Sequence, residues 1–175
     1  MKSLVNPFSK PGHLIRRLQQ YAVLIFHEET AGFDLTPTQY VTLQVLEHRP
    51  GIDQVTLSEL TAIDRSMTAR IVDALARRGL IDKRAAANDG RANSVFITAK
   101  ARRLLAAIEA SIDRSQAKIL APLPPAERRQ FMRMVRTLLD GYAKRRNANA
   151  LRPDYRKLTP PVLRWRRRRP EPDRS

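Results

Sequence analysis

Cysteine is absent from the 175 residues of this chain. Without thiols the protein can form neither a disulfide framework nor a thiol redox sensor, and it cannot hold zinc through cysteine ligands. Long apolar stretches are also absent, whereas a transmembrane helix needs about 18 consecutive apolar residues. The first residues, MKSLVNPFSKPGHL, lack the apolar segment of a signal peptide. We therefore expect a cytoplasmic protein that has no membrane partner.

Motifs typical of enzymes are missing as well. We find no nucleotide-binding glycine loop, no evident Ser-His-Asp set, and no paired histidine and carboxylate at catalytic spacing. The histidines are His13, His27 and His48, and the run His27-Glu28-Glu29 is more typical of a polar helix face than of a metal site. The sequence predicts a protein that is not an enzyme and that has no metal and no cofactor.

Acidic residues are few relative to basic ones. Lysine and arginine number 33, aspartate and glutamate 17, and the net charge is +16 with a pI near 11.3. This surplus favours a polyanionic partner, which could be DNA, RNA or an anionic membrane, and charge alone does not choose among them. Apolar residues make up 42% of the chain, which is enough for a hydrophobic core.

Three predicted helices occupy the first part of the chain. One runs from His13 to about Thr30, and no helix close in sequence covers its apolar stripe. The next is capped by Thr36 with Pro37 at its first position, and Pro50-Gly51 ends it. A third begins at the capping box Thr56–Glu59. The stripe of the first helix consists of Leu14, Leu18, Tyr21, Ala22, Ile25 and Phe26.

A fourth helix and a hairpin follow directly. Asp64 is the expected N-cap of this helix, and Gly79 follows its last turn as a C′ glycine. Leu80–Arg84 and Ser94–Ile97 alternate as two short strands, joined by a loop over Ala85–Asn93. This order predicts a mainly α fold with a small β wing, a winged helix-turn-helix. The fourth helix is expected to turn inward Met67, Ile71 and Leu75, and outward Ser66, Ala69, Arg70, Asp73 and Arg77.

The outward residues suggest contacts with DNA. Small side chains allow close approach to the groove floor, and Arg70 can bind guanine O6 and N7 in a bidentate way. Arg65 and Arg77 are better placed for phosphates. On the wing, Arg91 suits a narrow minor groove, and Asp89 would orient that arginine. The predicted DNA-binding residues are Arg65, Ser66, Thr68, Ala69, Arg70, Arg77, Lys83, Arg84, Asp89 and Arg91.

Two more helices and a basic tail complete the chain. Thr98 caps a helix that ends near Leu120, and the last helix runs from about Pro125 to Arg146. Pairing the apolar stripes of the first and last helices across a two-fold axis would bury both, and intrachain packing in a monomer is the alternative. The tail either adds phosphate contacts or solubilises the protein. We predict four segments: a dimerisation helix (1–35), the winged module (36–98), further dimerisation helices (99–146) and the flexible Pro/Arg-rich tail (147–175).

Several of these motifs together resemble one family. The segments FDLTPTQYVTLQVL, LSELTAIDRSMTARIVDALARRGLIDKR and ITAKARRLL, with Asp89-Gly90-Arg91 between the strands, are similar to the MarR family of transcriptional regulators. The resemblance extends from Pro11 to about Tyr142. It implies an obligate homodimer astride a pseudo-palindromic DNA operator. It also implies that Ser66–Arg70 enters the major groove and that Asp89 and Arg91 serve the wing.

The resemblance further implies a small-molecule effector, commonly a phenolic or aromatic acid. Such an anion needs a cation at one end and apolar walls elsewhere. The predicted effector-binding residues are His13, Arg16, Arg17 and Tyr40, with ordinary surface or core roles as the alternative. We therefore expect a homodimeric transcriptional repressor that is released from DNA by its effector. The main alternative is a non-specific or architectural nucleic-acid-binding protein.

Overall fold

The fold is mostly helical with one small antiparallel sheet, as the sequence predicts. The computed structural model describes residues 8, 10–86 and 89–146, so the tail from 147 lies outside the described residues. A short 3-10 helix, Ala31–Phe33, follows the first helix. The described α-helices are α1 (Pro11–Glu29), α2 (Pro37–His48), α3 (Gln54–Thr61), α4 (Arg65–Arg77), α5 (Ala99–Leu120) and α6 (Pro125–Arg146), and the strands are β1 (Ile81–Ala86) and β2 (Asp89–Ile97).

Side-chain caps set the starts of four helices. Thr36 and Gln39 form a reciprocal capping box at α2, and Thr98 accepts the Ala101 N–H at α5. The prediction for α3 was wrong, because the N-cap is Asp53, whose carboxylate accepts the Thr56 N–H at 2.8 Å. The helix therefore begins at Gln54, and its N-cap lies three residues earlier than predicted.

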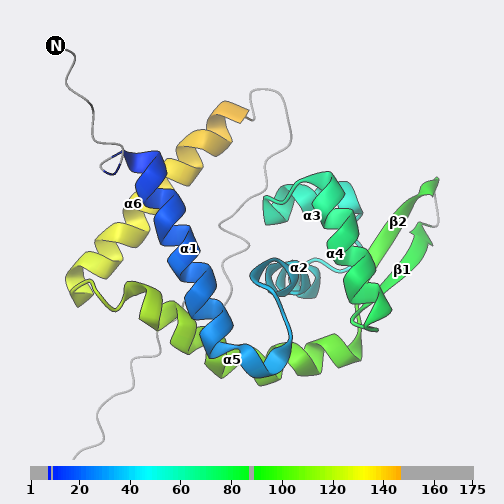
Figure 1. Cartoon of the computed structure of the whole chain (residues 1–175). Coiled ribbons are helices and arrows are strands. Elements are labelled where there is room, and N and C mark those ends of the chain that lie inside the picture. Colours follow the sequence, from blue (N-terminus) through cyan, green and yellow to red (C-terminus); the bar gives the residue numbers. More distant parts are fainter. Residues whose placement is uncertain (1–7, 9, 87–88, 147–175) are drawn as a thin grey trace, which may run out of the picture.

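The core lies in the winged module and continues along α5. Leu43 and Leu46 of α2 are fully buried, together with side chains of α3, α4 and both strands. Figure 1 shows α5 running along one edge of the molecule, from the hairpin at one end towards α1 and α6 at the other. Its contribution to the core comes from Ala101, Leu105, Ile108 and Ile112. This helix thus joins the winged module to the remaining helices.

The hairpin is longer than the sequence predicted. Its register pairs Ile81 with Ile97 and extends to a pair between Ala86 and Asp89, with an irregularity after Ala85. Most of the predicted loop over Ala85–Asn93 therefore belongs to the strands. Ile52, between α2 and α3, adds a single bridge to Val95.

Polar contacts fasten α5 near both ends. At its start, the Thr98 hydroxyl donates to the Gly79 carbonyl at 2.8 Å, which holds α5 against the end of α4. Nearer its other end, Glu29 from the last turn of α1 pairs with Arg114 at 2.8 Å and with Lys118 at 2.5 Å. Hydrogen bonds from Lys118 and Arg114 hold the pKa of the Glu29 carboxyl below its ordinary value.

Replacing Glu29 with glutamine is expected to weaken this junction and to reduce the acid sensitivity of folding. A carboxyl whose pKa is lowered in the folded state stabilises that state above its unfolded pKa, and the stabilisation is lost as the pH falls through the folded pKa. The free energy of unfolding should therefore fall more steeply below about pH 4.5 in the parent than in Glu29→Gln. Urea unfolding at matched protein concentration, at about pH 7 and about pH 3.5, checks this. Equal losses on acidification in both proteins would contradict it.

Two helices expose large apolar side chains. On α1 these lie on the faces that α5 leaves uncovered, and on α6 no described side chain is buried. On these two helices, the large apolar side chains more than 40% exposed are Leu14, Ile15, Leu18, Tyr21 and Leu24 on α1, and Met134, Leu138, Leu139 and Tyr142 on α6. In the described part of the chain, no helix is long and apolar enough to cross a membrane. A membrane-spanning helix therefore does not explain these apolar faces of α1 and α6.

Candidate nucleic-acid interface

The helix α4 lies beside the hairpin (Figure 1), and its exposed residues include three arginines. Asp64 caps it by accepting the Met67 N–H at 2.8 Å and the Ser66 hydroxyl at 2.8 Å, as the sequence predicted for this position. These two donors hold the pKa of Asp64 below its ordinary value. Arg65, Ser66, Arg70 and Arg77 are exposed and Ala69 is half-exposed. Five of the predicted DNA-binding residues therefore share an accessible surface.

Two residues of the first turns face opposite to the prediction. Thr68, predicted to contact DNA, is only 1% exposed, and its hydroxyl donates to the Asp64 carbonyl at 2.9 Å. It supports the helix from behind and cannot reach a groove. Met67, predicted to point inward, is 43% exposed. The buried face of α4 consists of Thr68, Ile71, Val72 and Leu75.

An ion pair ties the wing to α4. The Lys83 ammonium on β1 contacts the Asp73 carboxylate on α4, and this hydrogen bond holds the pKa of Asp73 below its ordinary value. Part of the Lys83 charge is therefore already balanced within the module. Sequence reasoning placed Asp73 on the outer face but missed this pairing, because it depends on how the strand lies against the helix.

The neighbouring arginine of the wing is held by an aromatic ring. The Arg84 guanidinium lies 4.5 Å from the centroid of the Phe96 ring on β2 and 4.0 Å from the Asp82 carboxylate. The Phe96 ring in turn lies against Gly51, where a Cβ atom would come within 3.0 Å of two ring carbons. Gly51 also has a positive φ of 80° and donates its N–H to the Val95 carbonyl. Gly51, Phe96 and Arg84 thus form one packed column under the wing.

Replacing Gly51 with alanine is expected to disturb this column. The left-handed backbone costs an L-residue about 1–2 kcal/mol, and the added methyl group must also displace the Phe96 ring. We expect unfolding to become easier by about 2 kcal/mol, measured by urea denaturation. Gly12→Ala is the matched control, because Gly12 lies in α1 and a Cβ there meets nothing within 4 Å. A Gly51→Ala protein as stable as Gly12→Ala would refute the role given to this glycine.

For the remaining predicted residues of the wing, the structure describes the backbone alone. Asp89 begins β2 and Arg91 follows two residues later. Their side chains, with those of residues 85–93 in general, lie outside what the structure describes, so the predicted roles of Asp89 and Arg91 stay predictions.

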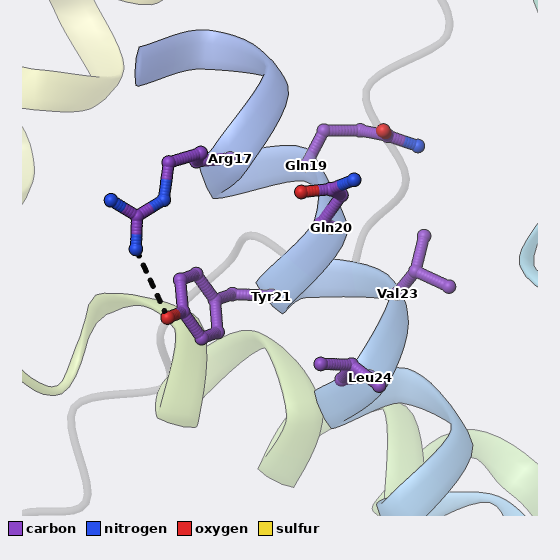
Figure 2. Close-up of a pocket in the computed structure, with 6 residues that line it drawn as sticks. All are labelled: Arg17, Gln19, Gln20, Tyr21, Val23 and Leu24. Carbon is purple, nitrogen blue, oxygen red and sulfur yellow. Dashed lines mark hydrogen bonds between the residues drawn. The ribbon is translucent and has the colours of Figure 1, made fainter. Parts of the chain in front are cut away.

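A surface hollow lies along α1. Its volume is about 640 Å³, and Figure 2 shows Arg17 reaching toward Tyr21, whose hydroxyl accepts a hydrogen bond from the guanidinium at 3.4 Å. This places a cation, a phenol ring and apolar side chains along one helix. The described lining residues are Arg17, Gln19, Gln20, Tyr21, Val23 and Leu24.

The other predicted effector-binding residues are not among those that line this hollow. Arg16 is exposed on α1, and the His13 ring makes an edge contact with the Phe8 ring at 5.4 Å between centroids. Tyr40 is half-buried on α2, and its ring centroid lies 5.9 Å from that of Phe26. Burial raises the pKa of the Tyr40 hydroxyl to about 12. The structure thus brings Arg17 together with Tyr21, a residue that sequence reasoning placed only in an apolar stripe.

A winged helix with an accessible arginine-bearing helix beside a hairpin defines a class of DNA-binding regulators. Residues 33–92 match the model of the MarR family. The transcriptional regulator HosA of Escherichia coli O127:H6 is 31% identical over 133 residues, which cover 75% of this chain and 96% of HosA. The chain therefore belongs to the MarR family, and its relatives are transcriptional regulators.

Two solved structures are also similar along most of the chain. PcaV of Streptomyces coelicolor, a transcriptional regulator in complex with its natural ligand, is 36% identical with a TM-score of 0.71, covering 78% of this chain and 96% of PcaV. BpsR of Bordetella bronchiseptica, whose DNA binding is regulated by 6-hydroxynicotinic acid, is 27% identical with a TM-score of 0.73, covering 77% of this chain and 96% of BpsR.

Proposed function

We propose that this member of the MarR family is a cytoplasmic homodimeric repressor that binds a pseudo-palindromic DNA operator and leaves it when a small aromatic acid binds. The observation that carries the proposal is the outer face of α4, where Arg65, Ser66, Arg70 and Arg77 are accessible beside the hairpin. In the proposal α4 enters the major groove, with Arg70 at base edges and the other two arginines at phosphates. Arg84 contacts the backbone from the wing.

The homodimer in this proposal is supported by the apolar faces of α1 and α6. An isolated chain would leave Leu18, Leu24, Leu138 and Tyr142 in water, each more than 40% exposed. Patches of this kind typically mark interfaces between protein chains. A two-fold axis relating these helices would bury them and set the two copies of α4 about 34–36 Å apart, one turn of DNA.

A titration against the DNA that flanks the gene of this protein tests the proposal, with random DNA as the control at about 150 mM salt. A regulator should prefer one site, centred on a two-fold sequence, by roughly 10³-fold or more. Equal binding to both DNAs would favour the architectural alternative, which the net charge of +16 also supports. Little binding to either DNA at low salt would remove DNA recognition from the proposal.

For the effector, we propose Arg17 and Arg16 as the candidate partners of a carboxylate; His13 and Tyr40 do not line the hollow. Arg17 has the stronger support because it lines the hollow with Tyr21. The regulation of BpsR by 6-hydroxynicotinic acid supports an aromatic acid as the ligand class.

Replacing Arg17 with alanine is expected to keep DNA binding and to weaken the response to aromatic acids. A hydrogen bond to a charged group is worth about 1.5–3 kcal/mol, so release should need about 10- to 100-fold more acid. Release of the labelled DNA site is measured with 4-hydroxybenzoic acid and 6-hydroxynicotinic acid, and 4-hydroxybenzamide is the neutral control. Arg16→Ala is measured in parallel. A normal response in both variants would show that neither arginine binds the acid.

A further inference from the structure

The first turns of α4 offer few side chains that are free to read bases. Thr68 is buried, and the Ser66 hydroxyl already donates to Asp64, so only its acceptor lone pairs remain for a ligand. Ala69 is half-exposed and carries only a methyl group. Three long side chains remain accessible on this part of the helix, Arg65, Met67 and Arg70, and of these Arg65 is the one assigned to phosphates.

Met67 differs from the other exposed apolar side chains in the helix on which it lies. Among the described large apolar side chains that are more than a third exposed, Met67 is the one that lies on α4, and the others lie on α1, α2, α3, α6 or at Phe8. Its neighbours on the outer face, Arg65, Ser66 and Arg70, are charged or polar. The one apolar group that the bases present in the major groove is the C5-methyl of thymine.

We propose that Met67 is a specificity-determining residue that contacts a thymine methyl group in the major groove. The inference rests on the proposed function, because it needs α4 in that groove. The thioether chain is unbranched and adapts its shape to the surface it meets. Its contact would favour T·A over C·G, since cytosine has no methyl group at this position.

The spacing of Met67 and Arg70 also predicts a feature of the operator. Met67 and Arg70 are three residues apart and share a helix face, separated by about 4.5 Å along the axis. Successive bases on one strand are about 3.4 Å apart. The thymine contacted by Met67 should therefore lie within about one or two base pairs of the guanine contacted by Arg70.

Removing single methyl groups from the DNA tests the inference. The full chain first selects its preferred duplex from a random-sequence library, and each thymine of one half-site is then replaced by deoxyuridine. One replacement, within about one or two base pairs of a guanine, is expected to weaken binding of the parent about fourfold, the factor for one buried methyl group. Met67→Ala should bind the parent duplex more weakly and should not respond to that replacement. Val41→Ala is the control, because Val41 on α2 is 38% exposed and should leave the response intact.

Each outcome decides the inference. Loss of the methyl response in Met67→Ala, with the response kept in Val41→Ala, supports it. A preferred duplex whose thymine methyl groups are all dispensable overturns the inference and leaves the proposed function standing, as does an unchanged methyl response in Met67→Ala. A selection that yields no preferred sequence overturns the inference and the proposed specific regulator together. Thermal unfolding of both variants shows that any change arises in the folded protein.

Discussion

Arg70→Ala is expected to abolish most of the preference for the operator over random DNA. Each bidentate contact between arginine and guanine is worth about 1–3 kcal/mol of discrimination, and a homodimer makes the contact twice. The affinity for the operator should therefore fall by about 30-fold to about 10⁴-fold, while binding to random DNA changes little. Equilibrium titrations of both DNAs at one salt concentration measure the two effects separately.

Arg77→Ala is the matched control for this experiment. Arg77 is exposed on the same helix and is assigned to phosphates, which carry no sequence information. Its loss should weaken binding to both DNAs alike and reduce the salt dependence by about one phosphate contact per half-site. If the two variants lost affinity for operator and random DNA in the same way, Arg70 would be a phosphate contact and the assignment of base reading would be wrong.

Leu138→Asp is expected to convert the homodimer to a monomer and to remove operator binding at working concentrations. Leu138 is 54% exposed on α6, within the apolar face that the proposal buries between two chains. A buried and unpaired carboxylate is far more costly than the leucine that it replaces. Losing the second half-site should weaken DNA binding by about 10²- to 10⁴-fold. Sedimentation equilibrium gives the mass, and titration with the selected duplex gives the affinity.

Arg133→Ala separates this effect from a change in net charge. Both substitutions lower the net charge by one, and Arg133 lies about 140° around α6 from Leu138. We expect Arg133→Ala to remain dimeric and to bind DNA with nearly the parent affinity. A parent protein that is monomeric at micromolar concentration, or a Leu138→Asp protein that stays dimeric, would exclude this face of α6 from the interface.

Local signals explain which elements could be predicted from the sequence. Thr36, Asp64 and Thr98 each precede an apolar helical pattern and have a side-chain oxygen that can accept an N–H at the helix start. Gly79 has the positive φ expected of a C′ glycine. The start of α3 was mistaken because Asp53 and Thr56 are both good caps, and the structure uses Asp53.

The two faces of α4 show where residue type misleads. Polarity suggested that Met67 is buried and Thr68 exposed, but Thr68 satisfies its hydroxyl with the carbonyl four residues earlier and so can be buried. The burial spacing of Thr68, Ile71, Val72 and Leu75 is i, i+3, i+4, i+7. The same pattern predicts the buried face of α4 correctly when Thr68 is counted with the apolar residues.

Contacts between distant segments could not be predicted in the same way. The pairing of Asp73 with Lys83, and the column of Gly51, Phe96 and Arg84, depend on how the hairpin lies against the helices. The association of Arg17 with Tyr21 is local, one helical turn apart, and could have been read from the sequence. The sequence could not predict which face of α1 carries the hollow, because that depends on tertiary packing.

The polar contacts of α5 with α4 and with α1 lie far apart along the helix, so a small rotation at one contact would be a larger displacement at the other. One end is fixed to α4 through Thr98 and Gly79, and about 24 Å along the helix Arg114 is fixed to Glu29 at the end of α1. A rotation of about 8° around the Arg114 end would carry the other end through about 3.4 Å, the rise of one base step. A rotation of this size where α1 meets α5 would therefore displace the winged module by a distance similar to the spacing of neighbouring base pairs.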